Sequence, residues 1–203
     1  MRQGMGMRFL FIACAALLIW GSASLQPPLW VYPAVFVLIF AFYANTVRER
    51  VPLYLTNRTT WAALAQILDD HGSSGVQRPA FVDLGCGLGG MLVYLARTKP
   101  DWDIVGVETA PGPYLIAKLR TAFIPNAQVR YQSLWKTDLA NFDVAYAFLS
   151  PAPMPRLHTK VAAEMRPGTL FVSNSFWADH QNFDGEIEVS DTRATHLIYY
   201  KQP

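Results

Sequence analysis

Cysteine is scarce in this 203-residue chain, which has only Cys14 in an apolar segment and Cys86 in a glycine-rich stretch. A pair so far apart, in such different surroundings, does not indicate a disulfide framework. Neither cysteine has a second Cys or a paired His nearby, as a zinc site would require. We therefore expect neither a disulfide nor a metal site, which is typical of a reducing compartment.

Charge is absent from a long N-terminal stretch. No Asp, Glu, Lys, Arg or His occurs from Phe9 to Val47, and no acidic residue precedes Glu49. From Arg48 onward acidic and basic residues are about equal in number, so the net charge of +2 comes from Arg2 and Arg8. Because this near-neutral region lacks the basic footprint of a nucleic-acid binder, no nucleic-acid partner is expected.

The uncharged stretch holds two apolar runs, Phe9–Trp20 and Leu29–Ala44. A helix needs about 20 residues to cross a bilayer, and each run reaches the lower end of that range only with its neighbours. Arginines at both ends of the stretch favour a transmembrane helical hairpin whose two ends face the cytoplasm. We expect residues 1–47 to be this anchor in the inner (cytoplasmic) membrane, and residues 48–203 to be a cytoplasmic catalytic domain. A signal-like segment followed by one span, and a pair of soluble core helices, are the alternatives.

Strand-like and helix-like patterns alternate over the remaining chain, which predicts an α/β fold with a mostly parallel sheet. The final two strands flank a turn and are expected to pair antiparallel. We therefore expect a Rossmann-like, doubly wound, seven-stranded sheet that ends in an antiparallel hairpin. The expected strands are Ala80–Leu84, Ile104–Val107, Gln128–Tyr131, Val144–Phe148, Thr169–Val172, Glu186–Val189 and His196–Tyr200. The expected helices are Thr59–His71, capped by Thr59 or Thr60, and Gly90–Thr98, Tyr114–Phe123 and Pro155–Met165.

The most informative stretch follows the first expected strand and contains Gly85, Gly87, Gly89 and Gly90. Glycines at a strand-to-helix turn let the backbone approach a ligand closely, and the next helix offers free N–H groups. A tight turn without a ligand explains one or two glycines, but it explains four within six residues poorly. The spacing also satisfies the dinucleotide fingerprint G-x-G-x-x-G, which is a weak signal when it stands alone.

Asp83, just before these glycines, distinguishes between nucleoside cofactors. A carboxylate there disfavours the pyrophosphate of a nicotinamide or flavin cofactor, but it can bind the cationic methionine end of S-adenosylmethionine (SAM). Glu108 ends the next strand, near the spacing expected of a carboxylate that binds ribose hydroxyls in either cofactor class. The pattern therefore predicts SAM bound by Asp83, by the glycine loop and by Glu108.

The motif Asp83-Leu84-Gly85-Cys86-Gly87-Leu88-Gly89 resembles the first motif of class I (seven-β-strand) SAM-dependent methyltransferases. The chain further resembles the membrane-anchored lysine methyltransferases of the ATP synthase c-subunit and the adenine nucleotide translocase, with their prokaryotic relatives. This resemblance implies that Cys86, Ser133 and Leu134 also contribute to the cofactor site, although the Ser133 position commonly carries an Asp. The segments that carry the closer resemblance are the apolar N-terminus, Val51–Thr56, Val105–Glu108, Ser133–Lys136 and Phe148–Met154.

The acceptor pocket is expected at the carboxyl edge of the sheet, where ligands of open α/β sheets bind. The candidates for this pocket are Tyr54, Thr56, Ser150 and Phe176. We expect protein N-methylation, most specifically of a lysine in a membrane or membrane-proximal protein. A small-molecule or lipid methyltransferase, and a non-catalytic SAM-binding membrane module, are the alternatives.

Overall fold

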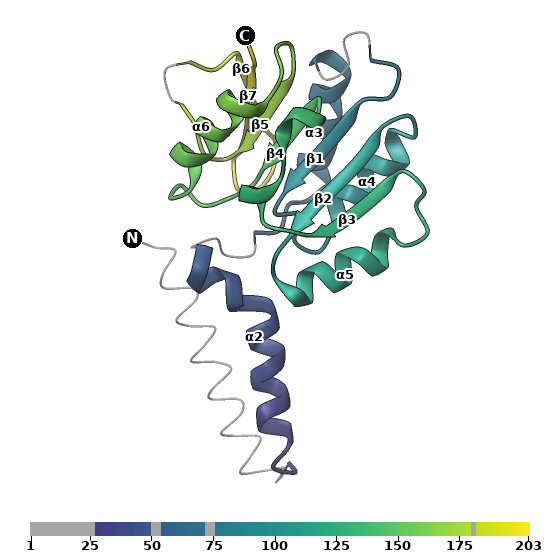
Figure 1. Cartoon of the computed structure of the whole chain (residues 1–203), viewed down its shortest axis with the longest axis vertical. Helices are drawn as coiled ribbons and strands as arrows, with labels where there is room; N and C mark the ends of the chain where they lie inside the picture. Colours follow the sequence, from purple (N-terminus) through teal and green to yellow (C-terminus); the bar gives the residue numbers. More distant parts are fainter. Residues whose placement is uncertain (1–26, 50–53, 72–75, 180–181) are drawn as a thin grey trace. The chain divides into compact units, whose positions relative to one another are not determined.

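The computed structural model describes residues 27–49, 54–71, 76–179 and 182–203. The chain divides into two compact units, Met1–Phe40 and Ala41–Pro203. The β-sheet and the helices that cover it belong to the second unit (Figure 1). The functional division into an anchor at 1–47 and a catalytic domain at 48–203 stays a prediction.

Helix α2, Val31–Glu49, begins two residues inside the second apolar run and extends beyond its end. Its apolar part, residues 31–44, would measure roughly 21 Å at 1.5 Å per residue, against a hydrocarbon core about 30 Å thick. In the described part of the chain no helix is long and apolar enough to cross a membrane. The expected second helix of a transmembrane hairpin is therefore not found, and the first run, Phe9–Trp20, lies outside the described residues.

The described strands form one seven-stranded sheet in the order β3-β2-β1-β4-β5-β7-β6. Strands β1 to β5 run parallel, and β7 lies antiparallel between β5 and β6. The predicted Rossmann-like, mostly parallel sheet with a final antiparallel hairpin is confirmed. The strands are β1 Ala80–Leu84, β2 Asp103–Glu108, β3 Ala127–Tyr131, β4 Val144–Ala147, β5 Leu170–Asn174, β6 Gly185–Val189 and β7 Thr195–Lys201.

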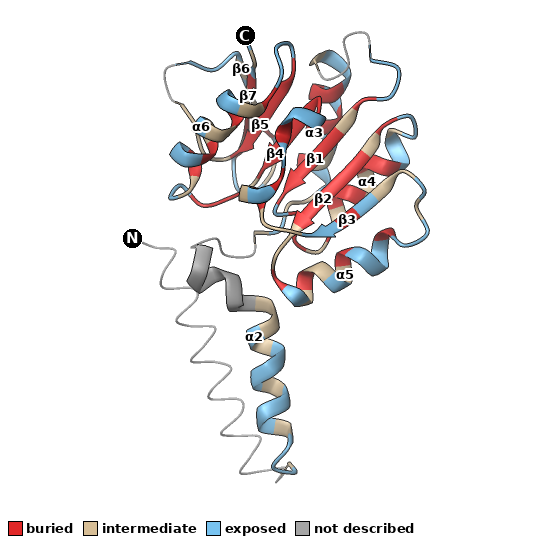
Figure 2. Ribbon diagram, in the orientation of Figure 1, coloured by how far each residue is buried: buried red, intermediate tan, exposed pale blue. Residues whose placement is uncertain are grey.

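Side chains that alternate along the strands build a separate core on each face of the sheet. Phe81 and Ile104 belong to one core, whereas their neighbours Val82 and Val105 belong to the other. The central strands are buried along almost their whole length (Figure 2). The first core includes residues of α3 Arg58–His71, α4 Gly90–Thr98 and α5 Pro111–Thr121, and the second includes residues of α6 Met154–Glu164 and the short helices η1 Leu134–Lys136 and η2 Leu139–Asn141.

The expected cap of the first domain helix is wrong by a few residues. Asn57 caps α3, because its Oδ1 accepts hydrogen bonds from Thr60 N at 2.9 Å and from Thr60 Oγ1 at 3.0 Å. The Asn57 amide in turn donates to Asp191 Oδ2 at 2.8 Å. This hydrogen bond connects the start of α3 with the turn between β6 and β7. Because the two segments are distant in sequence, the local sequence does not predict the contact.

Candidate cofactor and acceptor site

The glycine loop between β1 and α4 has a backbone that other residues rarely adopt. Gly85, Gly87 and Gly89 have φ values of 104°, 54° and 71°, all in the left-handed region. The N–H groups of Gly85 and Cys86 both donate to the Val107 carbonyl at 3.0 Å, which holds the loop against β2. The glycines of the motif are therefore required by the backbone as well as by the proposed ligand.

Gly89 also lies where a side chain would collide with the neighbouring helix. A Cβ built on Gly89 would stand 2.8 Å from the Cβ of Ala117 and 3.0 Å from its Cα, both on α5. Because Gly89 has no side chain, the loop can pack directly against α5. This packing places the amino end of α4 at the carboxyl edge of the sheet. Free N–H groups at a helix start are suited to polar or anionic ligand groups.

Asp83 lies near the end of β1 with only 4% of its surface exposed. Burial, and then the charge of Glu108, raise its pKa well above the ordinary value of an aspartate. No donor in the described part of the chain forms a hydrogen bond with its carboxylate. A buried carboxylate of this kind is stabilised as an anion by a ligand that brings positive charge.

Glu108, at the end of β2, organises the backbone around the loop. Its Oε2 accepts a hydrogen bond from Gly87 N at 3.0 Å. Its Oε1 accepts from Thr109 N at 2.7 Å and from Ala110 N at 2.8 Å, at the start of α5. A carboxylate has about four acceptor positions, so these three bonds leave about one for a ribose hydroxyl.

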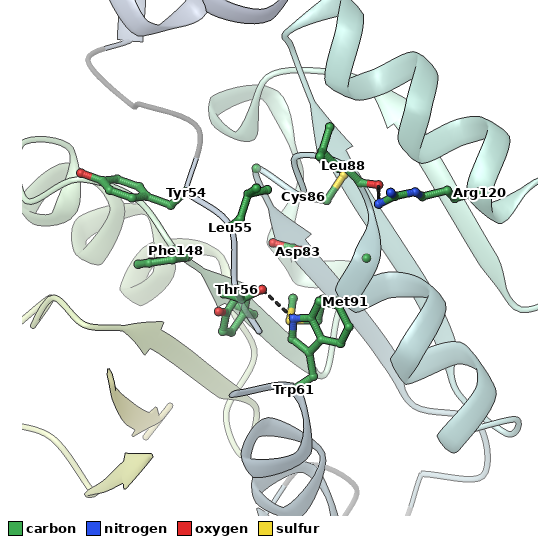
Figure 3. Close-up of a pocket in the computed structure, with 13 residues that line it drawn as sticks. Tyr54, Leu55, Thr56, Trp61, Asp83, Cys86, Leu88, Met91, Arg120 and Phe148 are labelled. Carbon is green, nitrogen blue, oxygen red and sulfur yellow. Dashed lines mark hydrogen bonds between the residues drawn. The ribbon is translucent and has the colours of Figure 1, made fainter. Parts of the chain in front are cut away.

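A cavity of about 240 Å³ opens beside Asp83 and the glycine loop (Figure 3). The connector before α3 forms one side of it through Tyr54, Leu55 and Thr56. Trp61 of α3 donates its indole N–H to Thr56 Oγ1 at 2.6 Å, which fixes the connector at the cavity. The remaining lining residues are Gly85, Cys86, Leu88, Gly90, Met91, Arg120, Tyr146 and Phe148.

An aromatic cluster stands at this cavity, formed by residues from three separate segments. The rings of Tyr54 and Phe148 are 5.0 Å apart, and those of Tyr54 and Phe176 are 6.5 Å apart. Burial raises the pKa of the Tyr54 hydroxyl, so this side chain is a neutral wall at physiological pH. Tyr54 and Phe148 line the cavity itself, whereas Phe176 packs near Tyr54 and does not line the cavity.

The structure brings only part of the predicted site into the cavity. Tyr54 and Thr56 line it, but Ser150 and Phe176 do not. Ser150 is buried, at 8% exposure. The Phe176 carbonyl accepts a hydrogen bond from Ser173 Oγ at 2.5 Å.

The predicted cofactor residues Ser133 and Leu134 lie beyond β3, outside the cavity lining. Ser133 Oγ already accepts a hydrogen bond from Trp135 N at 3.3 Å, at the start of η1, and Leu134 is buried. Cys86 lines the cavity, and burial raises its pKa well above that of an ordinary thiol. Its thiol is therefore a packing group at the cavity and not a thiolate.

Sequence reasoning missed two residues that shape the cavity. Tyr146 lies beside Asp83 in the β1–β4 register, and its hydroxyl accepts a hydrogen bond from Asn174 Nδ2 at 2.8 Å. Arg120 reaches across from α5 and donates to the Leu88 carbonyl at 3.0 Å. Tyr146 was indistinguishable from a core residue of a buried strand, and Arg120 from a solvated helix residue.

Metal chemistry has no evident place among the described residues, which contain no group of three or more His, Cys, Asp or Glu arranged to hold an ion. The residues that are present fit SAM instead. A buried carboxylate that accepts no hydrogen bond among the described residues, a left-handed backbone that favours glycine, and the second carboxylate Glu108 occur together at one edge of the sheet.

Comparison with known proteins gives the same fold and chemistry. Residues 83–182 match the model of the ANTKMT methyltransferase domain family. The secondary metabolism regulator laeA of Monascus pilosus is 31% identical over 110 residues, which cover 53% of this chain and 28% of that protein. The chain thus spans little more than a quarter of the length of this curated relative.

Solved structures share the fold at low sequence identity. An RNA methyltransferase from Salinibacter ruber, in complex with S-adenosyl-L-homocysteine, has a TM-score of 0.64 and 20% identity, covering 74% of this chain and 94% of its own. A precorrin-6y C5,15-methyltransferase from Geobacter metallireducens has a TM-score of 0.56 and 13% identity, covering 73% and 90%.

The match to a methyltransferase family, on this fold, confirms the expectation of a class I methyltransferase. The Salinibacter ruber structure holds S-adenosyl-L-homocysteine, and the match to a methyltransferase family model supports SAM as the cofactor of this chain. The roles of the individual site residues in binding SAM remain predictions.

Proposed function

We propose that the chain transfers the methyl group of SAM to the side-chain amine of a lysine in a membrane or membrane-proximal protein. The observation that carries the proposal is the cavity, in which Asp83, the glycine loop and an aromatic wall from the connector meet. Residues 83–182 match the model of the ANTKMT methyltransferase domain family, which supports the resemblance to lysine methyltransferases seen in the sequence.

The cofactor side of the cavity is formed by charge and backbone. Asp83 is suited to the ammonium group of the methionine end, and Glu108 has a free acceptor position for a ribose hydroxyl. When bound, SAM supplies a methyl group on a sulfonium, which the lone pair of an acceptor displaces in line. Holding two reactants in this alignment can supply roughly 7–11 kcal/mol of the barrier.

The acceptor side has to deprotonate and align an amine. An amine next to the rings of Tyr54 and Phe148 is partly removed from water, which lowers its pKa and favours the neutral form that has a lone pair. Thr56 Oγ1 accepts one hydrogen bond, from Trp61, and has a second lone pair for the amine N–H.

The membrane part of the proposal rests on the sequence and on α2. The stretch from Phe9 to Val47 has no charged residue, and Phe36, Leu38 and Phe40 of α2 are exposed. We assign this N-terminal segment to membrane attachment, with residues 48–203 on the cytoplasmic side. Attachment confines enzyme and acceptor to one surface and raises their effective concentration.

Mass spectrometry of membrane proteins from cells with and without the gene tests the acceptor. We expect a methylated lysine that is lost with the gene and restored by the wild-type chain, but not by Asp83→Ala. Loss of a methylated lipid or metabolite with no change in any protein would overturn the lysine proposal. It would still support methyltransferase activity. A matched control, Glu188→Ala on β6, removes a carboxylate away from the cavity and should restore methylation fully.

A further inference from the structure

We infer that the outer face of α5 is a second membrane contact, one that binds the surface of an anionic bilayer. We name this face the α5 patch and define it by Leu115, Lys118, Leu119 and Phe123. The inference deepens the proposed membrane placement and rests on it. It concerns a folded surface of the catalytic unit and not the N-terminal segment.

The apolar part of the α5 patch is unusually exposed. Leu115 and Leu119, one helical turn apart, are 57% and 66% exposed, and Phe123 just after the helix is 97% exposed. On the opposite side of the helix Ala117 and Thr121 are buried. Large apolar side chains at a spacing of four residues form one stripe, which a soluble surface rarely leaves contiguous.

The charged residues near the stripe indicate which kind of partner it binds. The stretch from residue 109 to residue 137 contains no Asp or Glu, although the region from Arg48 onward is neutral as a whole. Its charged residues are Lys118, Arg120, Arg130 and Lys136, all cationic. Lys118 is exposed beside the stripe, on the same helix.

A helix that carries Leu and Phe along one line and Lys or Arg beside it is typical of a segment that lies in the bilayer interface. Each cation near an anionic surface contributes on the order of 1 kcal/mol, and the apolar side chains enter the boundary between headgroups and acyl chains. A protein partner of the same patch would have to cover Phe123 in a pocket of its own, whereas a bilayer needs no such fit.

The α5 patch is connected to the cavity through one residue. Arg120 of α5 lines the cavity and donates to the Leu88 carbonyl at 3.0 Å, and Leu88 also lines it. Docking of the α5 patch would therefore bring this side of the cavity close to the headgroups. A lysine that emerges from a membrane protein at the bilayer surface is then within reach.

Site-specific photocrosslinking of the full chain in lipid nanodiscs tests the inference. Benzoylphenylalanine replaces Phe123, and in a matched control it replaces Ala162, an exposed residue of α6 on the opposite face of the sheet. Nanodiscs contain either phosphatidylcholine alone or phosphatidylcholine with one quarter phosphatidylglycerol. After irradiation, mass spectrometry identifies what is attached to each position.

We expect lipid adducts at position 123 and none above background at position 162. Their yield should fall several-fold without the anionic lipid, and several-fold in the variant Lys118→Gln. Adducts from position 123 to the chain's own residues 1–26, or to another protein in native membranes, would overturn the bilayer as the occupant. Nanodisc-bound protein that gives no lipid adduct at position 123 would refute the α5 patch alone. If the chain does not bind nanodiscs at all, the proposed membrane placement is refuted as well. The methyltransferase function is tested separately by SAM binding.

Discussion

Gly89→Ala perturbs the glycine loop in two ways that the structure separates. An alanine in the left-handed region costs about 1–2 kcal/mol by itself. The added methyl group would also stand 2.8 Å from the Cβ of Ala117, and overpacking of this kind typically costs a further 1–3 kcal/mol. We therefore expect the free energy of unfolding to fall by about 2–5 kcal/mol.

Gly168→Ala is the matched control for this substitution. Gly168 has a φ of 80°, close to that of Gly89, but a Cβ built there meets nothing within 4 Å. Only the backbone strain applies, so the loss should be about 1–2 kcal/mol. A domain of this size changes its melting temperature by about 2–4 °C per kcal/mol, so thermal unfolding should show shifts of roughly 10 °C for Gly89→Ala and roughly 4 °C for Gly168→Ala.

Calorimetric titration with SAM extends the comparison from stability to function. Because the clash moves the loop away from α5, Gly89→Ala should weaken SAM binding by tenfold or more, about 1.4 kcal/mol. Gly168 does not line the cavity, so the Gly168→Ala variant should bind SAM with the affinity of the wild type. Equal thermal shifts in the two variants, or unchanged SAM affinity in Gly89→Ala, would refute the account of the loop.

Three further substitutions test individual groups of the site. Asp83→Asn should raise the melting temperature of the SAM-free protein at pH 7 yet weaken SAM binding at least tenfold. The raised pKa of Asp83 makes its stabilising contribution complete below about pH 4 and progressively lost as the pH rises, so the wild type and the variant should converge in acid and diverge toward neutral pH. Glu108→Gln removes a charged acceptor from three backbone N–H groups, and we expect a loss of about 1–3 kcal/mol in urea unfolding together with weaker SAM binding; a fully stable variant would contradict the assigned hydrogen bonds. Thr56→Val leaves the Trp61 indole N–H without its acceptor, and steady-state kinetics should show a higher KM for the methyl acceptor than Thr56→Ser, which keeps the hydroxyl.

The fold could be predicted closely because its central strands are short, mostly apolar and buried runs. The β1 bounds, Ala80–Leu84, agree with the prediction at both ends, and the other strands differ by one or two residues. Helix starts were less predictable because caps depend on tertiary contacts. Asn57, which caps α3, also bonds Asp191 from the other end of the chain.

The site could be predicted where its residues adjoin a strand end, and not where the fold assembles it. The local sequence predicts that Asp83 and Glu108 belong to one site, because the carboxyl ends of parallel strands meet at one edge of the sheet. Tyr146 enters the cavity only through its pairing with Asp83, and Trp61 only through its bond to Thr56. The predicted transmembrane hairpin stays a prediction, because α2 runs from Val31 to Glu49 and no helix of the described residues is long and apolar enough to cross a membrane.

Methyl transfer to a protein lysine is the central claim, and one labelling experiment tests it most directly. The full chain is incubated with methyl-labelled SAM and a membrane fraction from cells that lack the gene, in parallel with Asp83→Ala. The account predicts label in protein, recovered as methylated lysine after acid hydrolysis, with the wild-type chain and not with the variant. Label confined to lipid or small molecules, or no transfer despite tight SAM binding, would contradict it.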